Sequence, residues 1–181
     1  RRVLILIALL AAPLAAEDAP APLDPCRIAA EAARPGRKLL DRCDRAIRQP
    51  DVPPPARLAM LMNRGIALLR AGQMAKAEAD FDLAIRSAPG LAEAWINKGV
   101  ALARQPGRET EAVALISHGI EIGPKEPARA YFARAQALEV AGRLKEAMDD
   151  YAAAARADPD WPAPAEELKR FRVERRKVLR G

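Results

Sequence analysis

The stretch Ala77-Glu78-Ala79-Asp80-Phe81-Asp82-Leu83-Ala84-Ile85 decides the fold, because its pattern returns twice farther along the chain. Small and large residues recur in the same order, each time 35 residues after the previous copy. The matched sets are Ala77, Ala112 and Ala147; Phe81, Ile116 and Tyr151; Ala84, Gly119 and Ala154; and Pro89, Pro124 and Pro159. A fixed period of this length indicates a series of stacked structural repeats.

A second pattern precedes each copy and has the spacing of a helix. Its members are Leu61, Gly65 and Leu68; Trp95, Gly99 and Leu102; and Tyr131, Ala135 and Leu138. Residues three and four apart share one helical face, so each unit predicts two amphipathic helices. The segments 71–73, 105–107 and 141–143 separate the two helices, and each contains a glycine that can end a helix in the left-handed conformation.

These motifs resemble the tetratricopeptide repeat family, whose period is about 34 residues. The resemblance implies an all-α, right-handed solenoid of antiparallel helix pairs. We expect three repeats within residues 56–161, at about 58–91, 92–127 and 128–161. The middle unit departs from the family pattern, because one residue is inserted near 105–108 and Ile116 and Gly119 replace the usual aromatic residue and alanine. An alanine-rich bundle with accidental periodicity is the alternative, and the three prolines in step argue against it.

Composition agrees with an all-α protein. Half of the 181 residues are hydrophobic, only 4% are aromatic, and the helix formers Ala, Leu, Arg and Glu are abundant. A chain of this length can bury one elongated core.

Residues 1–16 have the pattern of a signal peptide. Two arginines precede the apolar run 3–12, and Ala15 and Ala16 suit cleavage by a peptidase. The run is shorter than the roughly 20 residues that span a bilayer, and a retained membrane anchor is the alternative. We therefore expect an exported, periplasmic protein with a Pro/Ala-rich linker over residues 17–25.

The two cysteines, Cys26 and Cys43, predict a disulfide bond, because an even pair in an exported protein usually bridges. Two buried free thiols are the alternative, and a metal site is disfavoured because no histidine lies nearby. Residues 26–50 resemble a shortened, degenerate repeat in which Cys43 replaces the aromatic residue. This helical pair would cap the solenoid, and the prolines at 53–55 would break the chain before the first full repeat.

Residues 162–181 predict a basic capping helix. The segment holds seven basic and three acidic residues, and its few apolar residues include Leu168 and Phe171. Such a helix can be simply solvated, or it can contact anionic lipid or an acidic partner. Nucleic-acid binding is disfavoured, because no aromatic platform accompanies the charge.

No catalytic or cofactor-binding motif accompanies the repeats. The sequence has no phosphate loop, nucleophile elbow or metal-ligand spacing, and its single histidine, His118, is expected to be exposed. The carboxylates Asp80, Asp82, Asp149 and Asp150 are expected on outer, solvated helix faces. We therefore expect no enzyme activity, no cofactor and no metal.

In the resembled family, the first helix of each pair lines a concave groove that binds partners. The candidate contacts are Met62, Asn63, Ile66, Leu69 and Arg70; Ile96, Asn97, Val100 and Arg104; and Arg129, Phe132, Gln136 and Glu139. Asparagine can hydrogen-bond a peptide backbone and arginine can hold a carboxylate. Only Asn97 and Arg129 match the family's carboxylate clamp, so an apolar or mixed peptide is favoured. The alternative is that Asn63 and Asn97 merely satisfy neighbouring helices.

The sequence thus predicts a non-catalytic, exported adaptor that binds a peptide or partner protein in its groove. The alternative is a structural or assembly subunit, held at a membrane surface by the basic last helix or an uncleaved leader.

Overall fold

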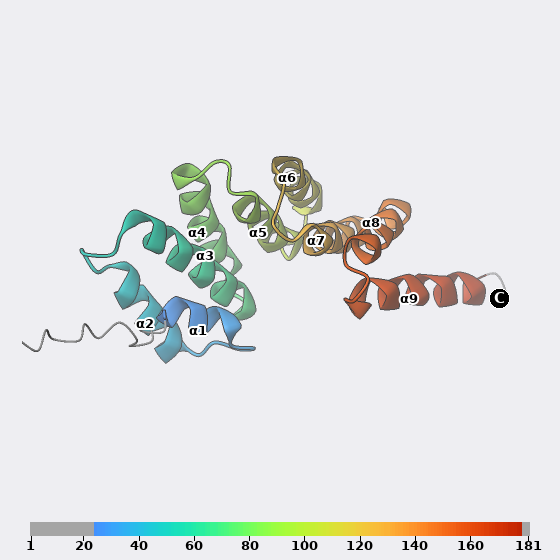
Figure 1. The fold of residues 1–181 in the computed structure, drawn as a ribbon. Helices are drawn as coiled ribbons and strands as arrows, with labels where there is room; N and C mark the ends of the chain where they lie inside the picture. The colour runs from blue at the N-terminus through green and yellow to red at the C-terminus, as the bar shows by residue number, and fades with distance from the viewer. Residues whose placement is uncertain (1–23, 179–181) are drawn as a thin grey trace, which may run out of the picture.

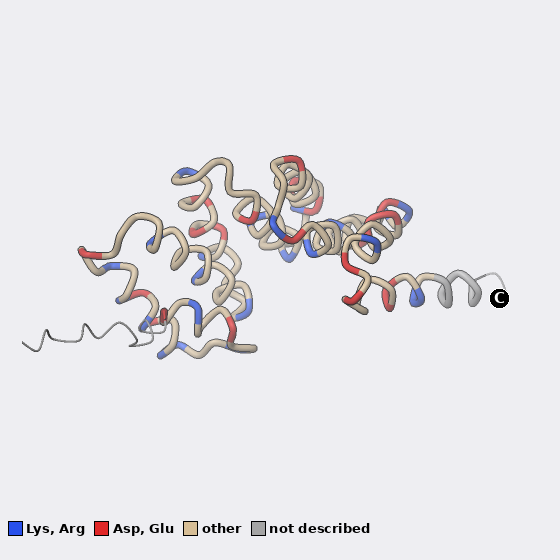
Figure 2. Tube along the Cα trace, viewed as in Figure 1, with Lys and Arg blue, Asp and Glu red and all other residues tan. Residues whose placement is uncertain are grey.

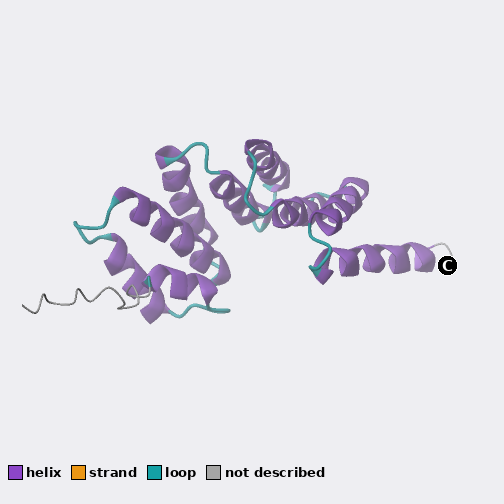
Figure 3. Cartoon of the chain, viewed as in Figure 1, coloured by secondary structure: helices purple, strands orange, loops and turns teal. Residues whose placement is uncertain are grey.

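The computed structural model describes residues 24–178, of which residues 172–178 are described by their backbone alone (Figure 1). Over this range all regular secondary structure is helical, as Figure 3 shows. The helices are α1 (Pro25–Glu31), α2 (Arg37–Ile47), α3 (Pro54–Arg70), α4 (Met74–Ser87), α5 (Ala92–Ala103), α6 (Glu109–Ile122), α7 (Pro127–Val140), α8 (Leu144–Ala157) and α9 (Pro162–Val178). The predicted all-α solenoid is confirmed.

The three repeats are the helix pairs α3/α4, α5/α6 and α7/α8. Within each pair the helices pack directly on one another, and the first helix of each repeat also packs on the second helix of the repeat before it. Phe81, Ile116 and Tyr151 are fully buried or nearly so, as their repeated position predicts. Because every repeat covers the apolar face of its neighbour, the core runs along the solenoid.

Glycine is required at two kinds of position in the repeats. The turns between paired helices contain Gly72 and Gly142, with φ values of 75° and 74°, a region that side-chain-bearing residues rarely adopt. Inside the middle repeat, a Cβ atom on Gly99 would lie 2.8 Å from the Ala112 carbonyl oxygen. The backbones of α5 and α6 are therefore in direct contact at this crossing.

The amino-terminal cap consists of α1 and α2. Asp24 caps α1 by accepting a hydrogen bond from the Cys26 backbone N–H at 2.8 Å. Cys26 and Cys43 lie at disulfide-bonding distance, with Cα atoms 4.6 Å apart, and both are fully buried. The proline break is shorter than expected: Pro53 is extended, whereas Pro54 already begins α3, because proline fits the first turn of a helix.

The carboxy-terminal helix α9 packs on α8. Phe171 is buried there, with its ring centroid 6.0 Å from that of Tyr151, and Leu168 packs against the same cluster. The side chains of Arg172 and of all later residues lie outside the described part, so the predicted basic surface of the helix stays a prediction.

Two other predicted segments also lie outside the described residues, namely the signal peptide at 1–16 and most of the linker at 17–25. Among the described residues, no helix has both the length and the apolar content needed to cross a membrane. Charged residues of both signs are spread along the described helices (Figure 2).

The expectation that Asp80 and Asp150 are solvated is wrong. Asp80 is 3% exposed and Asp150 is 7% exposed. Asp80 accepts two hydrogen bonds from Arg64, at 2.8 and 2.6 Å, and Asp150 accepts two from Arg134, at 2.7 and 2.8 Å. Each carboxylate faces its own partner helix rather than water, because an arginine of the first helix reaches across the pair. These bonds to Asp80 raise the pKa of Arg64 above its ordinary value.

Candidate interaction groove

The candidate site is an open groove of about 640 Å³ formed by the first helices of the three repeats. Its walls come from α3, α5 and α7 and from the loops that precede α5 and α7. The lining residues are Pro55, Leu58, Ala59, Met62, Asn63, Ile66, Leu91, Glu93, Ile96, Asn97, Val100, Pro124, Lys125, Glu126, Arg129, Ala130 and Ala133.

Apolar side chains make most of the groove wall. Met62 and Ile66 lie one helical turn apart on α3, and Ile96 and Val100 lie one turn apart on α5, so each pair projects from one face. All four also contact the core clusters beneath, which fixes the shape of the wall. The groove therefore offers apolar contact area that does not need rearrangement of the helices.

Two asparagines at equivalent repeat positions differ in their partners. Asn63 donates its Nδ2 hydrogen bond to Asp24 Oδ2 at 3.2 Å, so this amide is held by the residue that caps α1. This contact agrees with the alternative interpretation of Asn63, in which its side chain hydrogen-bonds a neighbouring helix and not a ligand. Asn97 is half-buried in the groove wall, and none of the described residues hydrogen-bonds its side chain. Its amide can both donate to and accept from an extended peptide backbone.

Charged groups gather at the α7 end of the groove and are largely paired. Arg129 forms an ion pair with Glu126 at 2.7 Å, and its guanidinium lies 4.7 Å from the centre of the Trp161 ring. Glu93 accepts a hydrogen bond from the Lys125 backbone N–H at 3.0 Å. Because Lys125, Glu126 and Arg129 are exposed, they can exchange these partners for those of a ligand.

Seven residues of the predicted site line the groove. They are Met62, Asn63, Ile66, Ile96, Asn97, Val100 and Arg129. The sequence did not single out Leu58, Ala59, Ala130 or Ala133, which also line it. The available signal was helical spacing, since Leu58, Met62 and Ile66 form one continuous stripe four residues apart.

The other predicted contacts lie outside the groove. Arg70 and Arg104 are at the carboxyl ends of first helices, where each donates a hydrogen bond at 3.3 Å to a carbonyl of the preceding unit, Ala32 O and Leu69 O respectively. Leu69 is itself buried in the core. These two arginines therefore tie successive units together.

Three predicted contacts on α7 also lie away from the groove lining. Phe132 packs its ring against Tyr151 and Trp161, with centroid distances of 5.2 and 4.8 Å. Glu139 accepts hydrogen bonds from Tyr151 and Arg170. Gln136 is exposed but outside the groove lining.

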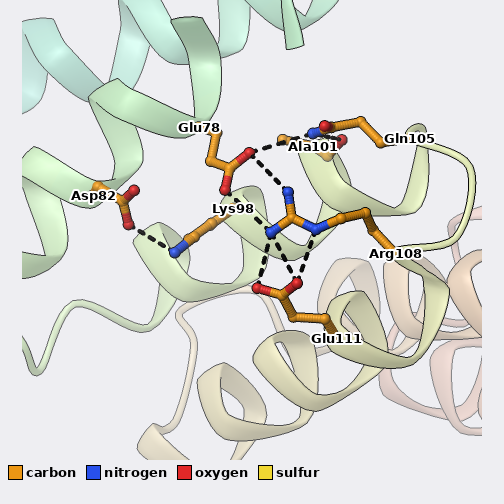
Figure 4. A network of polar contacts seen from close by, with 7 residues as sticks. All are labelled: Glu78, Asp82, Lys98, Ala101, Gln105, Arg108 and Glu111. Atoms are coloured by element: carbon orange, nitrogen blue, oxygen red, sulfur yellow. Dashed lines mark hydrogen bonds and ion pairs between the residues drawn. The ribbon is translucent and has the colours of Figure 1, made fainter. Parts of the chain in front are cut away.

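A polar network joins α4 of the first repeat to α5 and to the start of α6 in the middle repeat (Figure 4). Arg108, which precedes α6, contacts Glu78 of α4 at 3.3 Å and Glu111 of α6 at 2.8 Å. Lys98 of α5 forms an ion pair with Asp82 of α4 at 2.7 Å. These contacts join the first repeat to the middle one.

His118 lies apart from the groove, on α6. Its side chain is 51% exposed, and its ring meets the edge of Trp95 at a centroid distance of 4.6 Å. No group of three or more potential metal ligands occurs among the described residues.

Comparison with known proteins agrees with this architecture. The model of the tetratricopeptide repeat matches residues 40–92 and 124–162, which together are just over half of the chain. Two similar solved structures are a MamA RS-1 ArsTM double mutant and MamA 41-end from Desulfovibrio magneticus RS-1. Each is 22% identical, with a TM-score of 0.60 over 76% of this chain and 74% or 75% of the MamA chain respectively.

At this identity the likeness to MamA shows a shared fold only. The search of curated proteins found no match. The repeat spacing, the stacked helix pairs and the family match nevertheless agree, and the chain belongs to the tetratricopeptide repeat family.

Proposed function

We propose that this protein is a non-catalytic adaptor that binds an extended peptide segment of a partner protein in the groove between α3, α5 and α7. Repeats of this family typically form scaffolds for protein–protein interaction. The observation that carries the proposal is Asn97, a half-buried amide without a partner among the described residues, set in an apolar wall made by Ile66, Ile96 and Val100. An extended peptide offers backbone groups to such an amide and side chains to such a wall.

The test begins with a peptide-display selection against the whole chain, which yields a peptide that binds the protein and can be synthesised for measurement. The affinity of the selected peptide is then measured by calorimetry for the double variant Asn97→Ala/Arg129→Ala. We expect binding to weaken by about 1 to 3 kcal/mol with little change in melting temperature, because both side chains lie at the groove surface.

The matched control is Gln136→Ala/Arg156→Ala, which removes two exposed side chains that do not line the groove. Peptide affinity should stay within about twofold of wild type, since neither residue reaches the ligand. Equal loss of affinity in both double variants would show that the peptide does not bind in the groove.

We further propose that the protein is exported and acts in the periplasm. The support is the apolar run at residues 3–12 and the buried pair Cys26 and Cys43, which suits an oxidising compartment. Cell fractionation with mass spectrometry of the isolated protein tests this: we expect loss of the first 16 residues and recovery in the periplasmic fraction. Recovery in salt-washed membranes would instead favour the membrane-associated structural role.

A further inference from the structure

A second groove lies on a different part of the molecule, between α2 and α4. We call it the cap groove. It has a volume of about 1210 Å³, and it shares no lining residue with the groove between α3, α5 and α7. Its lining residues are Arg34, Pro35, Gly36, Arg37, Leu40, Asp41, Asp44, Arg64, Leu68, Arg70, Ala71, Gly72, Gln73, Lys76, Ala79, Asp80 and Leu83.

The rim of the cap groove is basic. Arg34, Arg37, Arg70 and Lys76 come from the α1–α2 loop, α2, α3 and α4, and all four are exposed. Neither Arg34 nor Lys76 has an acidic partner among the described residues, and Arg37 has only a distant one, Asp41 at 3.9 Å.

The acidic residues deeper in the cap groove are already neutralised. Arg64 bonds Asp80 at 2.6 Å and Asp44 at 2.8 Å, and Arg48 lies 3.8 Å from Asp44. These two arginines balance the two carboxylates, which therefore do not offset the charge of the rim. The buried side chains of Leu40 and Leu68 contribute an apolar floor, and Leu83 stands 41% exposed beside it. The groove thus combines a cationic rim with an apolar interior.

The groove at the equivalent place between α6 and α8 has different chemistry. That groove contains Arg134, Leu138 and Asp150, the repeat equivalents of Arg64, Leu68 and Asp80, but its volume is only about 280 Å³. At the positions equivalent to Lys76 and Ala79 it carries Glu146 and Asp149. The same place in the fold is therefore wide and basic in the cap, and narrow and acidic two repeats later.

We propose that the cap groove is a docking surface for an acidic segment of a partner protein that carries leucine-like side chains among its carboxylates. The carboxylates pair with Arg34, Arg37 and Lys76, and the apolar side chains contact the floor. A peptide fits better than a lipid surface, because the apolar floor is recessed below the charged rim and only a protruding side chain reaches it. This inference is independent of peptide binding between α3, α5 and α7.

The experiment uses the whole chain, labelled with ¹⁵N, and a synthetic acetylated peptide, Glu-Leu-Glu-Glu-Leu-Glu, with a nitroxide at its carboxyl end. We expect the nitroxide to broaden the amide signals of residues 34–41 and 72–83 and to leave those of 143–153 sharp. A peptide with glutamine in place of every glutamate should cause no broadening, because the rim recognises charge.

Two variants with equal loss of charge locate the interaction. Arg37→Gln/Lys76→Gln should weaken binding of the acidic peptide about threefold to tenfold, as expected for two exposed ion pairs. Lys145→Gln/Arg156→Gln, on the exposed surface of α8, should change it less than about twofold. Thermal melts of both variants confirm that they are folded.

Three results would overturn the proposal. They are absence of broadening in the cap groove, equal weakening in the two variants, and binding to phosphatidylglycerol vesicles that Arg37→Gln/Lys76→Gln abolishes while the peptide fails to bind. The last result would assign the surface to lipid instead. Because the groove between α3, α5 and α7 is untouched by these substitutions, its peptide affinity is unaffected by any of these outcomes.

Discussion

The first and third repeats differ from the middle repeat in how their two helices are held together. In the outer repeats a partly buried arginine of the first helix binds a buried aspartate of the second, as Arg64 binds Asp80 and Arg134 binds Asp150. In the middle repeat the equivalent positions hold Lys98 and Leu115, so the buried pair is missing. Lys98 turns instead to Asp82 of the preceding repeat.

The middle repeat has glycine at both helix positions of its crossing. Cβ atoms on Gly99 and Gly119 would lie 2.8 Å and 2.9 Å from the carbonyl oxygens of Ala112 and Ala92. In the first repeat, the three atoms nearest to a Cβ on Gly65 would all belong to the ring of Phe81. Backbone contact and packing thus replace the ion pair, and the family model matches the two outer repeats while leaving 93–123 unmatched. One fold therefore tolerates two solutions for joining the same helices.

The largest expected effect comes from breaking the backbone contact of the middle repeat. Gly99→Leu should destabilise the protein by about 3 kcal/mol or more, because a carbonyl oxygen cannot move aside as a side chain can. Thermal and urea unfolding measure the change. Gly90→Leu is the control, since no heavy atom lies near the place of its Cβ atom. Equal melting temperatures for wild type and Gly99→Leu would show that the backbone contact at Gly99 does not stabilise the middle repeat.

The next effect concerns the ion pairs of the outer repeats. Asp150→Ala should cost about 2 to 3 kcal/mol, because Arg134 would remain mostly buried and, among the described residues, would keep only the Ser117 hydroxyl as a hydrogen-bond partner. Asp80→Ala should cost less, since Arg64 keeps Asp44. Urea unfolding of the two variants gives the comparison, and a larger loss for Asp80→Ala would contradict it.

A smaller effect is expected for the contact that the middle repeat uses instead. Lys98→Ala should cost about 0.5 to 1 kcal/mol, since the Lys98–Asp82 pair is partly solvated and exposed pairs contribute little. A double-mutant cycle with Asp82→Ala isolates the interaction. Raising the salt concentration to about 1 M should reduce the coupling energy by screening. A coupling energy that does not change with salt would show that the Lys98–Asp82 pair is shielded from solvent like the arginine–aspartate pairs of the outer repeats.

The smallest effect is expected at the single histidine. His118→Ala should change the free energy of unfolding by no more than roughly 0.5 kcal/mol and leave peptide affinity unchanged, because the ring is half exposed and outside the groove. Its ring contacts Trp95, whose fluorescence reports the substitution directly. A loss of unfolding free energy above about 1 kcal/mol would show that the contact between His118 and Trp95 also stabilises the middle repeat.

The repeat spacing was sufficient to predict the fold, because the period fixes both helices of each pair and the glycines fix the turns between them. It did not predict the burial of Asp80 and Asp150. A carboxylate that interrupts an apolar helix face is interpreted as solvated unless its partner is known, and that partner lies 16 residues upstream on another helix. A signal was available in the sequence, because Arg64 and Arg134 occupy equivalent repeat positions, as Asp80 and Asp150 do.

The groove was predicted in part. Asn97 and Ile96 do line it, on one of the first helices that the family resemblance assigns to the concave face. Arg70 and Arg104 share that helix face but lie at its carboxyl end, where carbonyl groups of the preceding unit accept their hydrogen bonds. Position along a helix, as opposed to position around it, depends on where the neighbouring helices end, and the spacing does not give this.

If a ligand binds in the groove as proposed, the hydrogen bond between Asn63 and Asp24 links its binding to the folding of the cap. Asp24 uses one carboxylate oxygen to cap α1 and the other to hold the Asn63 amide in the groove. A ligand that recruits the Asn63 amide weakens this tie, and melting of α1 releases the amide to the ligand. The two effects are equal in size. The free energy by which unfolding of the cap strengthens ligand binding is the free energy by which ligand binding destabilises the cap. Hydrogen exchange in α1 would thus report, from outside the groove, whether the groove is occupied.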